Sequence, residues 1–169
     1  MKKVFLFIMM CLMAFSICVV TGCSRDDGEE ASGDYVDLGL SSHTKWKSVN
    51  EVNPADAEYD FFTYEEAMAQ FGEKLPSQLE CKELVNECEW IWMGTGYKVV
   101  GPNGNSIMMP AAGWRESDGT VRGVGASGWY WSATPYYSED AWVIYFSSPF
   151  VDMDYISRND GNSVRLVQD

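Results

Sequence analysis

Residues 77–92 read SQLECKELVNECEWIW, and the hydrophobic period changes within this stretch. Ser77 and Glu80 have the spacing of a capping box, which marks the start of a helix. The apolar residues that follow recur at the spacing of one helical face: Cys81, Leu84, Val85 and Cys88. From Glu89 onward apolar residues alternate with period two, the pattern of strands. A helical region followed by strands predicts the α+β class.

An earlier capping box, from Thr63 to Glu66, predicts a short helix that ends at Gly72. The apolar face of this helix consists of Tyr64, Ala67, Met68 and Phe71. Upstream, residues 35–40 and 44–49 predict a β-hairpin. His43 lies at its tip, and we interpret it as a residue that tolerates an unusual backbone angle.

The period-two region predicts strands joined by turns and loops. Pro102, Asn103 and Gly104 predict a tight turn, and residues 113–128 predict a loop rich in glycine and polar residues. The strand candidates are residues 90–92, 97–100, 106–109, 129–131, 142–146, 151–155 and 163–167.

The first 23 residues have the features of a bacterial lipoprotein leader. Lys2 and Lys3 precede an apolar run over residues 4–20, and Val-Thr-Gly-Cys at residues 20–23 has the form of the lipoprotein cleavage box. The run is shorter than the roughly 20 residues of a membrane-spanning helix. We therefore expect residues 1–22 to be removed as a signal peptide. Cys23 is then expected to carry a diacylglycerol and a further acyl chain, such as palmitate, that anchor the protein to a membrane.

Residues 23–34 are polar and acidic, and they predict a flexible tether. An acidic run directly after the lipid-bearing cysteine resembles the surface-export signal of lipoproteins in the Bacteroidetes. The resemblance implies an outer membrane lipoprotein that is exposed at the cell surface.

The chain is strongly acidic, with a net charge of -13 over 169 residues. Residues 1–22 hold two lysines and no acidic residue, so their removal (169 minus 22) leaves 147 residues with a net charge of -15. Such a charge repels phosphate backbones, and nucleic acid is not expected as a partner. The remaining length is enough for one domain with a core, residues 35–169.

Residues for catalysis or metal binding do not occur at the required spacing. Cys81 and Cys88 would lie about 10.5 Å apart along one helix, beyond the roughly 7 Å that a disulfide can bridge. His43 is the single histidine, so neither a zinc site nor a histidine-activated nucleophile is expected. We expect no catalytic residue, no metal site and no cofactor, and predict that the protein is not an enzyme.

Several short phrases occur in a characteristic order: YVDLGLSS at residues 35–42, TKW at 44–46, LPS at 75–77, GPNGNSI at 101–107, PAAG at 110–113, YWSAT at 130–134 and SVR at 163–165. Together they resemble the Fibrobacter succinogenes major paralogous domain, which is common in lipoproteins of gut Bacteroidetes. The resemblance covers nearly all of residues 35–169. It implies a C-type-lectin-like fold, in which two short helices pack beside a small twisted antiparallel sheet with long loops and close termini. It carries over no agreed activity.

Aromatic residues outside the predicted helices are the candidates for a binding surface. Flat indole and phenol rings stack on sugar faces or anchor protein contacts at little entropic cost. The candidate ligand-binding residues are Trp114, Arg115, Trp129, Tyr136 and Tyr137. We assign three other indoles to the interior: Trp46, Trp131 and Trp142. The sequence thus predicts a surface-anchored, non-catalytic binding domain for glycan or protein ligands.

Two alternative functions are open at this point. A structural subunit of a cell-surface assembly would oligomerise or carry an unpaired edge strand. A calcium-dependent lectin would bind sugar hydroxyls through a cation held by several oxygen ligands. The nearest candidate ligands are Glu139-Asp140 and Asn159-Asp160, whereas Asp152 and Asp154 are more simply the solvated face of a half-buried strand.

Overall fold

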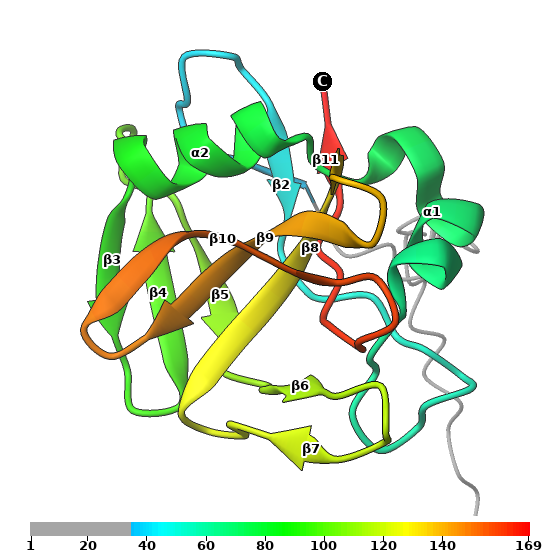
Figure 1. The fold of residues 1–169 in the computed structure, drawn as a ribbon. Coiled ribbons are helices and arrows are strands. Elements are labelled where there is room, and N and C mark those ends of the chain that lie inside the picture. Colours follow the sequence, from blue (N-terminus) through cyan, green and yellow to red (C-terminus); the bar gives the residue numbers. More distant parts are fainter. Residues whose placement is uncertain (1–34) are drawn as a thin grey trace, which may run out of the picture. The chain divides into compact units, whose positions relative to one another are not determined.

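The computed structural model describes residues 35–169, which form an α+β fold of two helices and several small antiparallel sheets (Figure 1). These residues belong to one compact unit. The predicted signal peptide, the tether and Cys23 lie outside the described residues.

Both helices begin at the predicted capping boxes. Helix α1 (Tyr64–Phe71) has Thr63 as its N-cap, and α2 (Gln78–Glu87) has Ser77. In each box the hydroxyl accepts a hydrogen bond from the amide three residues later, and the glutamate at that position accepts one from the N-cap amide. Gly72 ends α1 with a φ of 52°, and the 3-10 helix η1 (Gly72–Lys74) follows.

The strands form three antiparallel sheets and one hairpin in the described residues. The sheet β1-β2-β11 consists of β1 (Tyr35–Asp37), β2 (Lys45–Lys47) and β11 (Val167–Gln168). The sheet β3-β4-β5 consists of β3 (Glu89–Trp92), β4 (Gly96–Val100) and β5 (Ser106–Pro110). The sheet β10-β9-β8 consists of β8 (Ser127–Tyr136), β9 (Asp140–Ser147) and β10 (Phe150–Ser157). The hairpin pairs β6 (Trp114–Arg115) with β7 (Val121–Arg122).

The predicted N-terminal hairpin is confirmed. Tyr35 pairs with Lys47 and Asp37 with Lys45, and His43 at the tip has a φ of 65°. Strand β11 pairs with β2, so the first and last strands of the described residues share one sheet.

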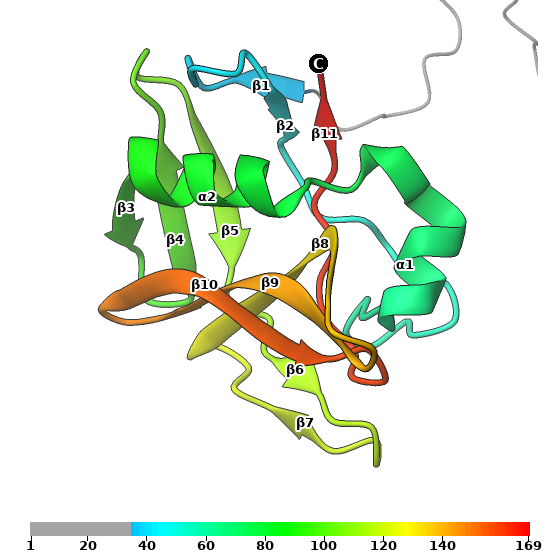
Figure 2. The same ribbon diagram turned by 45° about the horizontal axis from the view of Figure 1, so that its top comes forward.

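The β8–β9–β10 sheet lies between two core clusters, because successive residues of a strand point to opposite faces. One face packs with α2 and the β3–β4–β5 sheet, and Figure 2 shows α2 running across both sheets. This face contributes Tyr130, Ile144 and Phe146 to the core. The other face packs with α1 and contributes Trp131, Ala141 and Val143. The two helices therefore cover opposite faces of one central sheet.

Arg165 lies in the interior and is 1% exposed. Its Nε donates to Oδ1 of Asn50 at 2.9 Å, its Nη1 to the carbonyl of Lys47 at 2.8 Å, and its Nη2 to the carbonyl of Met108 at 2.6 Å. Burial lowers the pKa of this guanidinium. Arg165 thus joins β2, the loop that follows it and β5.

Two predicted segments differ in the structure. The loop predicted over residues 113–128 contains the hairpin β6–β7, whose turn is closed by a carboxylate: Oδ1 of Asp118 accepts from the amide of Thr120 at 2.8 Å. The strand predicted over residues 163–167 is reduced to Val167–Gln168. Ser163 makes only an isolated bridge with Tyr130, because the side chains that follow enter the core instead of extending a sheet.

The assignment of Trp142 to the core is wrong. Trp46 and Trp131 are buried as expected, but Trp142 is only half-buried, between the buried residues Ala141 and Val143 of the opposite face. It lies near the start of β9, beyond Ile144 and Phe146, the residues of its face that belong to the core cluster. Cys81 is buried, while Cys88 forms the half-buried C-cap of α2, and both thiols are free.

Candidate functional site

Apart from Phe150, the partly exposed aromatic rings of the β8–β9–β10 sheet gather in two places. The turn cluster, where β8 turns into β9, consists of Tyr136, Tyr137, Trp142 and Tyr155. The hairpin cluster, beside β6, consists of Trp114, Trp129 and Tyr145.

Tyr136 is the centre of the turn cluster. Its ring centroid lies 4.4 Å from that of Tyr137, 4.8 Å from Trp142 and 4.2 Å from Tyr155. Tyr137 is 79% exposed and Tyr155 is 47% exposed. From α2, the amino group of Lys82 lies 5.7 Å from the Trp142 ring centroid, within the range of a cation–π contact. The cluster is an open aromatic surface with a cation at its rim.

The hairpin cluster is packed more tightly. The Trp129 ring lies 5.2 Å from Trp114 and 4.4 Å from Tyr145, and all three side chains are half-buried. The indole Nε1 of Trp129 is buried and has no hydrogen-bond partner among the described residues. Arg115 turns away to form an ion pair with Asp56. This cluster therefore leaves less aromatic surface for a ligand.

The predicted ligand-binding residues do not form one surface. Trp129 pairs with Tyr145 of β9, whereas Tyr136 pairs with Asp140, which precedes Tyr145 by five residues on the same strand. Because strand residues alternate between faces, Trp129 and Tyr136 lie on opposite faces of the sheet. Seven residues of β8, or roughly 20 Å of strand, also separate them. Trp114 and Trp129 belong to one cluster, and Tyr136 and Tyr137 to the other.

Arg158, which directly follows β10, holds the turn that presents Tyr137. Its Nε donates to the carbonyl of Asp140 at 3.0 Å, its Nη2 to the carbonyl of Tyr137 at 3.1 Å, and its amide to the carbonyl of Glu139 at 2.9 Å. Its guanidinium lies 4.9 Å from the ring centroid of Tyr64 on α1. Tyr137 has a φ of 51°, an uncommon angle for a bulky residue, and these contacts offset its cost.

A polar pocket adjoins this turn. Its cavity volume is about 230 Å³. The residues that line it are Glu65, Ser138, Glu139, Arg158 and Asn159. The two acidic dipeptides considered as calcium ligands, Glu139-Asp140 and Asn159-Asp160, are brought together here by the hydrogen bond from the Arg158 amide to Glu139. Within residues 35–169 no three histidine, cysteine or acidic side chains gather in an arrangement that could hold a metal ion.

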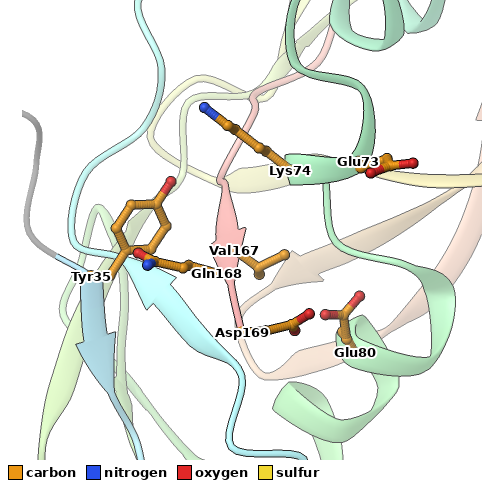
Figure 3. Close-up of a pocket in the computed structure, with 7 residues that line it drawn as sticks. All are labelled: Tyr35, Glu73, Lys74, Glu80, Val167, Gln168 and Asp169. Carbon is orange, nitrogen blue, oxygen red and sulfur yellow. The ribbon is translucent and has the colours of Figure 1, made fainter.

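A larger pocket of about 570 Å³ lies beside β1 and β11 (Figure 3). It is lined by Tyr35, Glu73, Lys74, Glu80, Val167, Gln168 and Asp169. Figure 3 shows the carboxylates of Glu80 and Asp169 pointing toward one another. Glu80 also serves the capping box of α2, where it accepts from the Ser77 amide at 2.7 Å. None of the lining residues belongs to either aromatic cluster.

The two thiols are poor nucleophiles. Burial raises the pKa of Cys81 far above its ordinary value. Burial, and then the charges of Glu87 and Glu83, raise the pKa of Cys88 to about 11. Both therefore remain protonated near neutral pH. In the part of the chain that the structure describes, no helix is long and apolar enough to span a bilayer.

The sequence prediction omitted Trp142, Tyr155 and Tyr145 from the candidate residues, and it also omitted Arg158. The sequence does contain a signal for Trp142 and Tyr155. A two-residue turn at residues 148–149 sets the register of the β9–β10 hairpin, and in this register Trp142 is the cross-strand partner of Tyr155, as the structure shows. Arg158 gave no signal, because its partners are backbone carbonyls of a turn some 20 residues earlier.

Part of the chain matches a known family. Residues 85–167 match the model of a family described as a domain of unknown function (DUF8237). The matched range extends from α2 to β11, so it contains both aromatic clusters and Arg158 but not α1. No curated protein and no solved structure matches the chain.

Proposed function

We propose that the protein is a surface-anchored lipoprotein whose domain binds glycans at the turn cluster and catalyses no reaction. The observation that carries this proposal is the contact of four aromatic rings at one exposed turn, with Tyr137 79% exposed. Aromatic rings pack against the C–H faces of sugars, while nearby polar groups bind their hydroxyls. Arg158 holds the turn in place, so little ordering is needed on binding.

We also propose that the domain has a C-type-lectin-like fold and is related to the Fibrobacter succinogenes major paralogous domain. Three features support this: the two helices, the small antiparallel sheets, and the pairing of β11 with β2 that brings the first and last strands together. The membrane anchor in this proposal is the lipid on Cys23, which the leader sequence predicts. The acidic run after Cys23 favours the outer membrane and the cell surface.

The edge of the central sheet favours a binding domain over a structural subunit. Strand β10 is an outer strand of its sheet. The amide of Met153 donates to Oδ1 of Asp152 at 2.7 Å, and that of Tyr155 to Oδ1 of Asp154 at 2.8 Å. These amides are therefore already hydrogen-bonded and less available to a partner strand. The aspartates that the sequence marked as a solvated strand face thus also protect this edge.

A glycan array tests the proposal. We would use the full-length protein in an amine-oxide detergent, which contains no sugar, with and without calcium. Wild-type protein is expected to bind a subset of neutral glycans, Tyr137→Ala to lose this binding, and Phe150→Ala to retain it. Phe150 is a matched control, because it is 68% exposed and lies outside the turn cluster.

Two results would contradict the proposal: no glycan bound by the wild-type protein, or equal binding by wild type and Tyr137→Ala. Binding that disappears without calcium would favour the calcium-dependent lectin instead.

A further inference from the structure

We propose that the polar pocket beside the turn is a second sugar subsite, so that the domain recognises two or more linked units of a neutral oligosaccharide. This inference rests on the proposed function, because it extends the glycan site at the turn cluster. It assigns a role to Glu65, Ser138, Glu139 and Asn159.

The pocket and the turn cluster meet at the tip of the β8–β9 turn. Tyr137 carries the most exposed ring of the cluster, and the next residue, Ser138, lines the pocket. Glu65 belongs to α1, which packs on the face opposite to Trp142. Figures 1 and 2 both show the β8–β9 turn beside α1. A sugar stacked on the aromatic face therefore does not fill the pocket, whereas a second linked unit can pass over the tip and enter it.

The lining groups suit sugar hydroxyls, which both donate and accept hydrogen bonds. The carboxylates of Glu65 and Glu139 accept, and the amide of Asn159 and the hydroxyl of Ser138 do both. Nε and Nη2 of Arg158 already donate to carbonyl oxygens. Its Nη1 lies 3.9 Å from Oε1 of Glu65, which is too far for a hydrogen bond. The N–H groups of Nη1 are therefore available to donate to a ligand.

The charge of the pocket favours a neutral sugar. Two carboxylates face one guanidinium among its lining residues, and the whole chain has a net charge of -13. An anionic sugar, such as a uronic or sialic acid, would meet repulsion from both glutamates. The same groups accept hydrogen bonds from neutral hydroxyls without this cost.

Titration calorimetry on the full-length protein in the same sugar-free detergent tests the inference. The probes are glucose, galactose, mannose and N-acetylglucosamine, together with a disaccharide and a trisaccharide of each. For the sugar that binds, the disaccharide is expected to bind about tenfold more tightly than the monosaccharide, since the pocket adds one or two hydrogen bonds. Glu139→Ala and Asn159→Ala, which each remove a hydrogen-bonding side chain from the pocket, are expected to remove most of this gain and to leave monosaccharide binding unchanged.

The matched control is Glu89→Ala, which removes an exposed carboxylate on β3 that lines neither pocket. Glu139 and Asn159 are exposed, so their variants are expected to fold, and thermal unfolding verifies this. If a monosaccharide binds but the disaccharide gains nothing, or if both variants keep the gain, the second subsite is wrong while the proposed function survives. If no probe binds, both are wrong.

Discussion

Nη2 of Arg158 donates a hydrogen bond to the backbone carbonyl of Tyr137 at 3.1 Å. This contact joins the end of β10 to the turn between β8 and β9, and it fixes the most exposed ring of the turn cluster. Arg158 is a positioning residue for the turn cluster, because it acts on a glycan there through the turn that presents Tyr137. Its remaining donor, Nη1, serves the neighbouring pocket.

Arg158→Gln is expected to weaken glycan binding about tenfold, because Tyr137 then loses part of the support for its positive φ and the turn must order on binding. Arg158→Lys is not expected to rescue binding, since a single amino group cannot reproduce the fork that reaches two carbonyls. Titration calorimetry, performed well below the unfolding temperature of each variant, measures the effect. Arg122→Gln serves as the control, because Arg122 is an exposed residue of β7. Wild-type affinity in Arg158→Gln would refute the positioning role.

Arg165→Met is expected to lower the free energy of unfolding by about 3 kcal/mol, because three acceptors around this buried side chain would lose their donor. The acceptors are Oδ1 of Asn50 and the carbonyls of Lys47 and Met108. Urea denaturation measures this loss. Arg122→Met, an exposed substitution, should stay within about 0.5 kcal/mol of wild type. Equal stability of the two variants would show that the buried guanidinium contributes nothing.

Cys88 is expected to react slowly with iodoacetamide at pH 8. Its pKa rises from 9.0 to about 11, so its thiolate fraction at this pH is about a hundredfold lower than that of an ordinary cysteine. Peptide mass mapping assigns the labelled residue, and labelling in urea is the control. The folded state favours the neutral thiol of Cys88. Its contribution to the free energy of unfolding is therefore fully present below pH 9 and is lost as the pH rises toward 11. Rapid labelling of folded protein at pH 8 would contradict the burial of this thiol.

Cys23→Ser is expected to abolish incorporation of labelled palmitate when the full chain is expressed in a bacterial host, because the thiol at position 23 carries the diacylglycerol. Cys18→Ser is the matched control, since it changes a cysteine inside the predicted signal peptide and should leave labelling intact. Label retained by Cys23→Ser would exclude the proposed anchor.

The helices and the first hairpin could be predicted because their signals are local. The capping boxes at Thr63 and Ser77 and the turn at His43 each depend on a few neighbouring residues, and all three are confirmed. The coarse α+β class follows from the same patterns. The short hairpin β6–β7 was missed because polar residues and glycines dominate it, so no hydrophobic alternation marks its strands.

The candidate site was harder to predict because it depends on which residues meet across strands. The sequence indicated Trp129 and Tyr136 equally, and only the strand register separates them onto opposite faces. Trp142 follows the alternation of a core strand, yet the core cluster ends before it. The support from Arg158 arises from tertiary contacts to backbone carbonyls, which no side-chain pattern reports.

The affinity of turn-cluster variants for the glycan that binds most tightly in the array tests the central claim most directly. Titration calorimetry should show that Tyr137→Ala and Trp142→Ala each weaken binding about tenfold or more, the cost of losing one stacked ring, while Phe150→Ala binds as the wild type does. If Tyr137→Ala and Trp142→Ala keep wild-type affinity, the glycan binds elsewhere and the turn cluster is not the site.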